Sequence, residues 1–285
     1  MTLVNCGVHA RDSNSERLAS ILKNSKRIIM SKLITVENPR GTKLTFSESD
    51  HKYSDENNNV YRSVTKIIHC LFPEFERDKI AMFSAKKRGC TVQEILQEWK
   101  DIADTACTKG TLVHRYAECM LQSIPFDMRA TTQEQADCIK LVHAFIPKLM
   151  ERYEFVEAEK IIFSEEFKLA GTVDLIMRNK NTGNYAIFDW KTNKEIKLRD
   201  EYGKYGKMFL SKIPHCNYYH YALQLNVYRY ILVAEGYGDF NDCELALFHI
   251  HPNHKKGIKP YLIPDMTEHA KLILDYVKET HGDIW

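Results

Sequence analysis

The sequence predicts an α/β fold, in which a mixed β-sheet is flanked by helices and preceded by a helical part. Two observations predict this fold. Helical periodicity dominates residues 63 to about 153, and strand-like apolar runs separated by a polar turn then fill residues 155–192. A further helix and strand follow without an internal repeat, a low-complexity tract or an obvious linker. We therefore expect residues 1–33 to be an N-terminal extension and residues 34–285 to form one domain.

Local signals justify each element in turn. Residues 34–65 alternate apolar and polar positions between turn signals, which predicts short strands. Apolar spacing of three and four predicts helices over about 63–71, 77–88, 92–106, 110–121, 133–153, 218–235 and 267–280. Pro73 ends the first helix, and Pro147 should kink the fifth. Residues 244–250 are predicted to be a strand, and a basic, aromatic connection fills residues 193–216.

The composition is that of an ordinary globular protein. Of 285 residues, 44% are hydrophobic and 27% are charged, which suffices for one large core or two small ones. A run of about 18 apolar residues does not occur, so we expect no membrane span. The formal net charge is +2, so any contact with nucleic acid has to depend on a local basic surface.

The cysteines and the N-terminus favour an intracellular, reducing compartment. The eight cysteines are scattered without a C-x-x-C pair, which gives no local support to structural zinc or to an iron–sulfur cluster. Residues 1–6 lack the pattern of a secretory signal. Residues 17–32 are basic and partly amphipathic, which leaves a mitochondrial transit peptide open beside the favoured surface helix or floppy arm. Cytoplasm, nucleus and mitochondrion are not distinguished, and a viral or phage origin is possible.

The most informative stretch is a predicted β-hairpin within residues 171–192. Two apolar runs flank the turn at residues 179–184, which is rich in residues that tolerate positive φ. Asp174 lies on the first strand, and Asp189 and Lys191 lie on the second, where a spacing of two points both side chains to one face. Two carboxylates and an amine that converge at the end of a sheet can hold a divalent metal beside a phosphate.

An acidic residue two positions before a lysine is uninformative alone. The same spacing occurs at four other places, where we expect a solvated face: Asp50, Glu98, Glu166 and Glu195. Asp189 differs because it ends an apolar strand and follows Asp174 across a hairpin. A simple charged cap of the sheet remains the alternative.

Residues 171–174 and 189–191 together resemble the PD-(D/E)XK nuclease superfamily. Three further stretches are similar to its RecB-like branch, in that branch's order: residues 61–65, residues 110–114, and Gln224 with Tyr228. The first of them resembles a segment of viral, phage and mitochondrial-genome-maintenance-type exonucleases. Two features depart from family patterns. Thr172 and Val173 replace the classical proline before the aspartate, as is common in this branch, and the cysteine cluster of the iron–sulfur relatives is absent, so no cluster is expected.

The resemblance implies one or two divalent metals, Mg²⁺ or Mn²⁺, in each site. Asp174 and Asp189 would be oxygen ligands, and the backbone carbonyl of Trp190 would be a further ligand. His114 would bind the metal from the helix side, with a structural role as the alternative. Lys191 would orient or deprotonate the attacking water and stabilise developing negative charge.

Other expected contacts belong to the substrate. Gln224 and Tyr228 lie one helical turn apart on one face, where they would steady the site and contact the substrate, or simply pack. The connection after Lys191 interleaves cations with aromatic residues, which suits single-stranded nucleic acid, although a solvated loop is equally open. The substrate-binding residues expected there are Lys194, Lys204, Tyr205 and Lys207.

Three features stay open. Glu159 and Glu166 could each add a metal ligand, although a solvated edge is favoured for both. Residues 249–256 contain three histidines that could bind zinc, although an exposed basic loop is favoured.

We predict a metal-dependent DNA nuclease whose restriction-endonuclease-like core spans about residues 108–250. The resemblance alone favours an exonuclease that acts on single-stranded ends or flaps in replication, repair or recombination, with single-stranded DNA as its partner. An endonuclease for DNA or RNA, a silent nucleic-acid-binding subunit and a hydrolase of another substrate are the alternatives. The intact set of Asp174, Asp189 and Lys191 disfavours the silent subunit.

Overall fold

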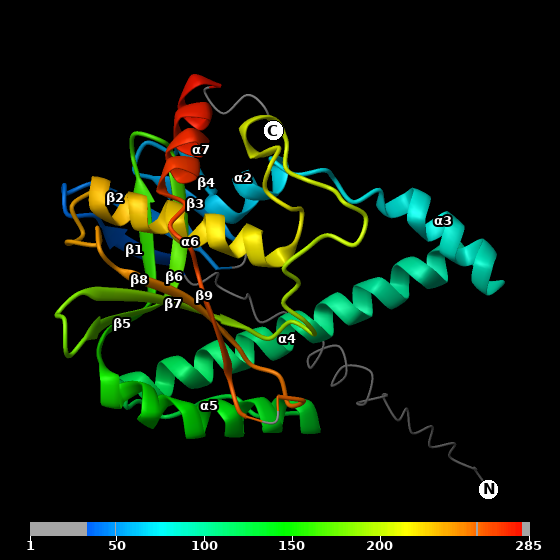
Figure 1. Ribbon diagram of the computed structural model, residues 1–285, viewed down its shortest axis with the longest axis horizontal. Coiled ribbons are helices and arrows are strands. Elements are labelled where there is room, and N and C mark those ends of the chain that lie inside the picture. The colour runs from blue at the N-terminus through cyan, green and yellow to red at the C-terminus, as the bar shows by residue number, and fades with distance from the viewer. Residues whose placement is uncertain (1–32, 49, 255, 281–285) are drawn as a thin grey trace, which may run out of the picture.

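In the part of the chain that the structure describes, nine strands form one mixed sheet with helices on both faces (Figure 1). The computed structural model describes residues 33–48, 50–254 and 256–280. The mixed sheet between helical layers confirms the predicted α/β fold. The expected N-terminal extension and its amphipathic segment lie outside the described residues, apart from Leu33, which begins the first strand.

The strands run mostly antiparallel. They are β1 (Leu33–Glu37), β2 (Lys43–Ser47), β3 (Lys52–Asp55), β4 (Val60–Ser63), β5 (Tyr153–Ser164), β6 (Leu169–Asn179), β7 (Tyr185–Lys191), β8 (Glu244–His249) and β9 (Lys259–Leu262). The order across the sheet is β1-β2-β3-β4-β6-β7-β8-β9, and β5 also pairs with β6. The β4–β6 and β7–β8 pairs are parallel. The hairpin β6–β7 therefore lies inside the sheet, as the sequence predicts, whereas β9 was not predicted.

Two helical layers cover the sheet. Helices α2 (Val64–Cys70), α6 (Asn217–Ala234) and α7 (Thr267–Glu279) lie on one face, and α4 (Val92–Gln122) and α5 (Gln133–Arg152) lie on the other (Figure 1). Their apolar residues enter two cores on opposite sides of β7, because successive strand side chains alternate. Ile187 enters the core under α6, and Phe188 enters the core under α4 and α5.

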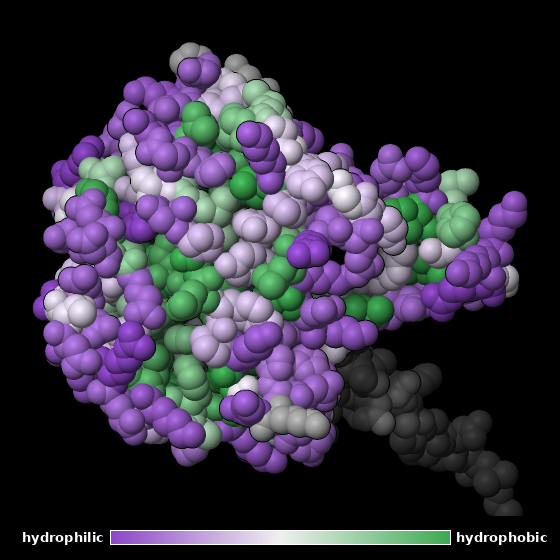
Figure 2. Space-filling view, viewed as in Figure 1, coloured by the Kyte–Doolittle hydropathy of each residue, from purple (hydrophilic) through white to green (hydrophobic). Residues whose placement is uncertain are grey.

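A helical arm projects from this body. Helix α3 (Arg77–Arg88) packs on the first turns of α4 through a small core of Ala81, Ala85 and Ile95, and the pair extends away from the sheet (Figure 1). Figure 2 shows apolar surface on the arm. The exposed apolar residues of α3 include Met82 and Phe83. None of the described helices combines the length and the apolar character needed to cross a lipid bilayer.

Helix α4 corrects the sequence prediction, because one continuous helix replaces two. It begins with a capping box, in which Thr91 and Glu94 satisfy each other's backbone N–H groups. Gly110 was expected to begin a new helix, yet a Cβ there would make only ordinary contact, 3.7 Å from Oγ1 of Thr192. A glycine inside a helix costs only about 1 kcal/mol, which tertiary packing offsets. His114 therefore lies on a long helix that crosses the sheet.

Candidate active site

The hairpin β6–β7 brings the two predicted aspartates together. Gly183 has φ +77° in the turn and donates its N–H to the carbonyl of Asn179. Leu175 pairs with Phe188 across the hairpin, and one step further in this register Asp174 lies opposite Asp189. The N–H of Trp190 also donates to Oδ2 of Asp174 at 2.9 Å. The chain of the second strand thus fixes the carboxylate of the first.

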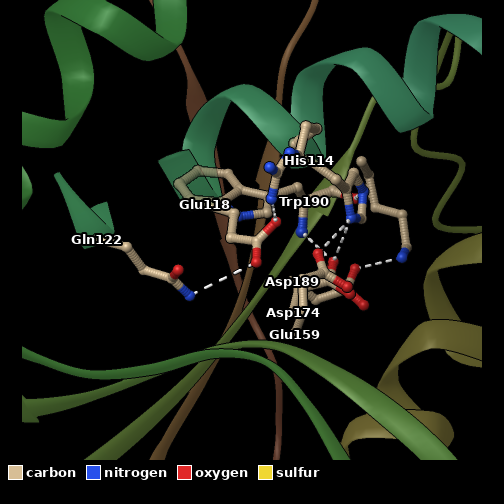
Figure 3. Close-up of polar contacts among 9 residues, drawn as sticks. His114, Glu118, Gln122, Glu159, Asp174, Asp189 and Trp190 are labelled. Carbon is tan, nitrogen blue, oxygen red and sulfur yellow. Dashed lines mark hydrogen bonds and ion pairs between the residues drawn. The ribbon is translucent and has the colours of Figure 1, made fainter. Parts of the chain in front are cut away.

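His114 of α4 and Glu159 of β5 complete this cluster (Figure 3). Each of His114, Glu159 and Asp174 offers a ligand atom, and these atoms lie within 4.8 Å of one another. Nδ1 of His114 is 3.3 Å from Oε1 of Glu159 and 3.5 Å from Oδ2 of Asp174. One imidazole and two carboxylates from three elements therefore meet at one point.

The contacts of His114 determine how the ring is used. Nε2 lies 3.1 Å from the carbonyl oxygen of Trp190, which can only accept a hydrogen bond, so Nε2 carries a proton. Nδ1 is left facing the two carboxylates. A metal-binding histidine commonly donates its other ring N–H to a backbone carbonyl in this way. The carbonyl of Trp190 thus orients the ring of His114. The predicted role of this carbonyl as a metal ligand stays a prediction.

Glu159, for which the sequence left a metal ligand open beside a favoured solvated edge, lies in the cluster with 33% of its side chain exposed. The pairing of Ala158 with Leu175 and of Lys160 with Val173 places Glu159 opposite Asp174 across the β5–β6 ladder. Its φ of +50° is unusual for glutamate, and such backbone strain is frequent at functional sites. Glu166, by contrast, forms an ion pair with Lys278 at 2.7 Å, as a surface residue would. The register of β5 with β6, which cannot be read from the sequence, places Glu159 in the site and Glu166 outside it.

Asp189 and Lys191 form a buried ion pair beside the cluster, and 3% and 16% of their side chains are exposed. Burial raises the pKa of Asp189 to about 6, and the negative charge of Asp174 adds to this although Lys191 opposes it. Burial also raises the pKa of Asp174. Asp174 and Asp189 therefore share the charge of Lys191 in a poorly solvated place, and a divalent cation would relieve the repulsion between them.

The two basic groups of the site are held in their charged forms by the same carboxylates. Burial by itself would lower the pKa of His114, but Asp174 and Glu159 outweigh it and raise that pKa to about 9. Burial would likewise lower the pKa of Lys191, but Asp189 and Asp174 raise it above its ordinary value. Lys191 is thus a fixed positive charge beside the carboxylates.

Gln224 and Tyr228 lie on α6 behind the hairpin. Nε2 of Gln224 donates to the hydroxyl of Tyr228 at 3.0 Å, and burial raises the pKa of that hydroxyl. A Cβ on Gly171 would come within 2.6 Å of this hydroxyl oxygen, so the glycine of the Gly-Thr-Val-Asp stretch makes room for the tyrosine. The pair therefore braces β6 just before Asp174, and its predicted contact with substrate stays a prediction.

The expected substrate-binding cations lie apart from the carboxylates. Nζ of Lys207 donates to the carbonyl of Cys70 at the end of α2, and Tyr205 forms an isolated bridge with Pro214. Lys204 is exposed. Within the described chain, no hydrogen bond or ion pair joins these three residues to the carboxylates. Lys194 lies nearer, since it follows β7 by three positions and lines a groove along α4.

Two openings flank the site. A cleft of about 1020 Å³ between α4, β5 and the β1–β2 hairpin exposes His114 and Glu159, and its walls include the acidic residues Glu118 and Glu157. A groove of about 770 Å³ on the other side runs from α4 to residues 192–194 and contains Lys109. The site is therefore open to solvent on the histidine side.

The chain belongs to the PD-(D/E)XK nuclease superfamily, which matches over residues 91–282 and so confirms the resemblance. Among solved structures it is similar to one from Eubacterium rectale described as a "Putative exonuclease". The two chains are 16% identical, the match covers 62% of this chain and 66% of that one, and the TM-score is 0.38. The match thus spans slightly less than two thirds of that chain, and no functional conclusion rests on it. Curated proteins gave no match.

Proposed function

We propose that this nuclease-superfamily protein is a divalent-metal-dependent deoxyribonuclease that degrades DNA from single-stranded ends. The observation that supports the proposal most strongly is the meeting of His114, Glu159 and Asp174 within 4.8 Å, beside the Asp189–Lys191 ion pair. Asp174 and Asp189 repel each other in a poorly solvated place, which costs stability, and a bound divalent cation would offset that cost.

The donor set fits Mg²⁺ or Mn²⁺. Carboxylate oxygens are the ligands that these hard cations prefer, and one imidazole nitrogen is compatible with Mn²⁺ in particular. His114, Glu159 and Asp174 would hold the metal. Asp189, which the sequence predicts as a further ligand, is not one of the three residues whose ligand atoms lie within 4.8 Å of one another, and it pairs with Lys191. A bound metal would supply an activated water and neutralise negative charge on the phosphate.

The remaining residues have roles that follow from their contacts. Lys191 carries its charge at neutral pH, so it is suited to stabilising negative charge on the phosphate, and less suited to removing a proton from water. Asp189 fixes the lysine through their ion pair. The Trp190 carbonyl holds the ring of His114.

Single-stranded DNA as the substrate is supported by the connection between β7 and α6. This segment exposes Tyr202, Tyr205 and Met208 among several lysines, and bases stack on such aromatic side chains while cations neutralise phosphates. Action at ends and a role in replication, repair or recombination depend on the family resemblance. We also propose an intracellular, reducing compartment, which the free thiols of buried Cys119 and Cys138 support.

The proposal is tested with an end-labelled single-stranded oligonucleotide and its circular counterpart, each incubated with Mg²⁺, Mn²⁺ or EDTA. Metal-dependent loss of the linear strand, with the circle intact, is the expected result. Cutting of the circle would replace the exonuclease with an endonuclease on the same core. Retained binding without cleavage under either metal would refute the catalytic proposal and leave a nucleic-acid-binding subunit.

A further inference from the structure

The ammonium group of Lys191 lies against an aromatic ring that the sequence motifs do not include. Its Nζ is 4.6 Å from the centroid of the Tyr221 ring, on the second turn of α6. We propose that Tyr221, held in place by Asn193, is a positioning residue for Lys191 in the nuclease reaction. The inference rests on the proposed function, because it concerns the lysine of that site.

Tyr221 is itself fixed at its far end. Its hydroxyl donates to Oδ1 of Asn193 at 3.1 Å, and burial raises the pKa of the hydroxyl, so it stays protonated and can donate. Asn193 follows Lys191 by only two residues. The tyrosine thus joins α6 to the stretch of chain that leaves β7, and its ring is clamped between the lysine charge and this hydrogen bond.

A pair of histidines holds Asn193 from the other side. Nε2 of His249, at the end of β8, lies 2.7 Å from the carbonyl oxygen of Asn193, and Nδ1 of His249 lies 2.8 Å from Nε2 of His254. The Asn193 carbonyl can only accept, so Nε2 of His249 carries a proton. A neutral His249 therefore accepts from His254 at Nδ1, which matches the lowered pKa values that burial gives both rings.

These contacts leave the histidine-rich segment without the geometry of a zinc site. The ring nitrogens of His249 and His254 that face each other are hydrogen bonded, and among the described residues the converging set of ligand atoms lies at His114, Glu159 and Asp174. Backbone pairing adds to the brace, since the N–H of Ile250 donates to the carbonyl of Lys191 at 2.8 Å. The loop after β8 is thus tied to the strand that carries the lysine.

The position of the lysine needs such a brace for a physical reason. Lysine has a flexible four-carbon stem, and holding that stem in one rotamer costs side-chain entropy. The ion pair with Asp189 fixes the distance of the ammonium group from one carboxylate, whereas the face of Tyr221 restricts its direction. An ammonium over an aromatic face is attracted to the ring, most strongly where water is excluded. Small displacements of a catalytic group are costly in rate.

The test compares three variants with the wild type and with Lys191→Ala. Tyr221→Leu removes the ring, Tyr221→Phe keeps the ring and removes the hydroxyl, and Asn193→Ala removes the acceptor at an exposed position. Tyr230→Leu is the matched control, because Tyr230 lies on the same helix but its ring contacts Phe167. For each protein we would measure kcat and KM on a single-stranded oligonucleotide, affinity for that oligonucleotide in EDTA, and thermal unfolding.

A positioning role predicts a split between kcat and KM. Tyr221→Leu should lower kcat roughly tenfold to thirtyfold, the factor that corresponds to a desolvated cation–π contact, with KM and the EDTA affinity unchanged. Tyr221→Phe and Asn193→Ala should lower kcat only a few fold, and Tyr230→Leu should leave it unchanged. Equal kcat in Tyr221→Leu and the wild type, or a loss that Tyr221→Phe does not rescue, would overturn the inference. An inactive wild type would refute the proposed function, and the inference with it.

Discussion

The two halves of the predicted site differ in how firmly the fold holds them. His114, Glu159, Asp174, Asp189 and Lys191 come from α4 and three adjacent strands, and each contacts another member of the set. The connection at residues 193–216 is mostly irregular, and its lysines and aromatic residues are largely exposed. Paired strands determine the first half, whereas single contacts such as that of Lys207 with α2 determine the second.

This difference teaches which functional residues can be assigned from geometry. The buried half is the set of five residues on α4 and the three strands. Charged side chains there need a partner or a ligand, because unpaired charges are expensive where water is excluded. Those in the exposed half do not, since a solvated lysine on a loop costs nothing. Catalytic roles in the buried half can therefore be inferred from contacts and burial. The proposed binding of DNA by the exposed half rests only on its content of lysines and aromatic residues.

The largest expected effect is that of Lys191→Ala. Loss of this fixed positive charge should lower the cleavage rate about 10²- to 10⁴-fold, because in the proposed reaction the lysine would stabilise negative charge on the phosphate. Binding of single-stranded DNA in EDTA should be largely retained, since the exposed half is untouched. Single-turnover cleavage and fluorescence anisotropy would measure the two effects.

The matched control is Lys100→Ala. Glu98 and Lys100 have the same sequence spacing as Asp189 and Lys191, but Lys100 is solvated and pairs with Asp104. The control should cleave at the wild-type rate. Near-wild-type cleavage by Lys191→Ala would show that Lys191 has no catalytic role, and the buried half would then lose its assignment as the catalytic part of the site.

A second prediction concerns metal binding and pH. In the metal-free protein the pKa of His114 is about 9, so the ring is protonated at pH 7, and a metal has to displace that proton. Affinity for Mn²⁺ should therefore rise about tenfold per pH unit from pH 7 and level off near pH 9, with about one proton released per metal bound. Calorimetry in buffers with different heats of ionisation measures this release.

Two variants sharpen this prediction. Glu159→Gln removes one negative neighbour of His114, so the pKa of the histidine should fall and the proton release at pH 7 should decrease. His114→Gln should remove the release in this pH range. Affinity that does not change between pH 7 and 9 would show that His114 is not a ligand.

The sequence predicted most of the buried half, because strand pattern and motif spacing report the same hairpin. Asp174, Asp189 and Lys191 are brought together as predicted, and His114 joins them from α4. Glu159 was left open because its place depends on the register of β5 with β6, a long-range property that local pattern does not specify. Tyr221 gave no signal for a related reason, since its neighbours on α6 are also tyrosines.

A third prediction compares two glycines from the motifs. Gly171→Ala would place a Cβ within 2.6 Å of the Tyr228 hydroxyl, so the buried ring has to move, at a cost of about 1–3 kcal/mol in the free energy of unfolding. Gly110→Ala meets only Oγ1 of Thr192 at 3.7 Å and should stabilise the helix by about 0.5–1 kcal/mol. Urea unfolding measures both. Equal effects would show that Tyr228 does not restrict β6.

The smallest expected effects belong to the connection. Lys204→Ala should weaken binding of single-stranded DNA and flatten its salt dependence by about 0.7 in the slope of log K against log salt, the value for one phosphate contact. Lys207→Ala should change the slope less, because the ammonium group of Lys207 already donates to the carbonyl of Cys70 at the end of α2. The double variant should show the sum of the two changes.

The measurement is anisotropy in EDTA between 50 and 200 mM salt, with Lys180→Ala as the control. Lys180 is also exposed and also donates to a backbone carbonyl, that of Met150, but it lies in the turn between β6 and β7. An unchanged slope in both single variants would exclude the connection from the path of DNA. A larger effect at Lys207 than at Lys204 would mean that bound DNA displaces the contact of Lys207 with α2. The conformation of the exposed half would then depend on bound substrate, whereas that of the buried half is fixed by the paired strands.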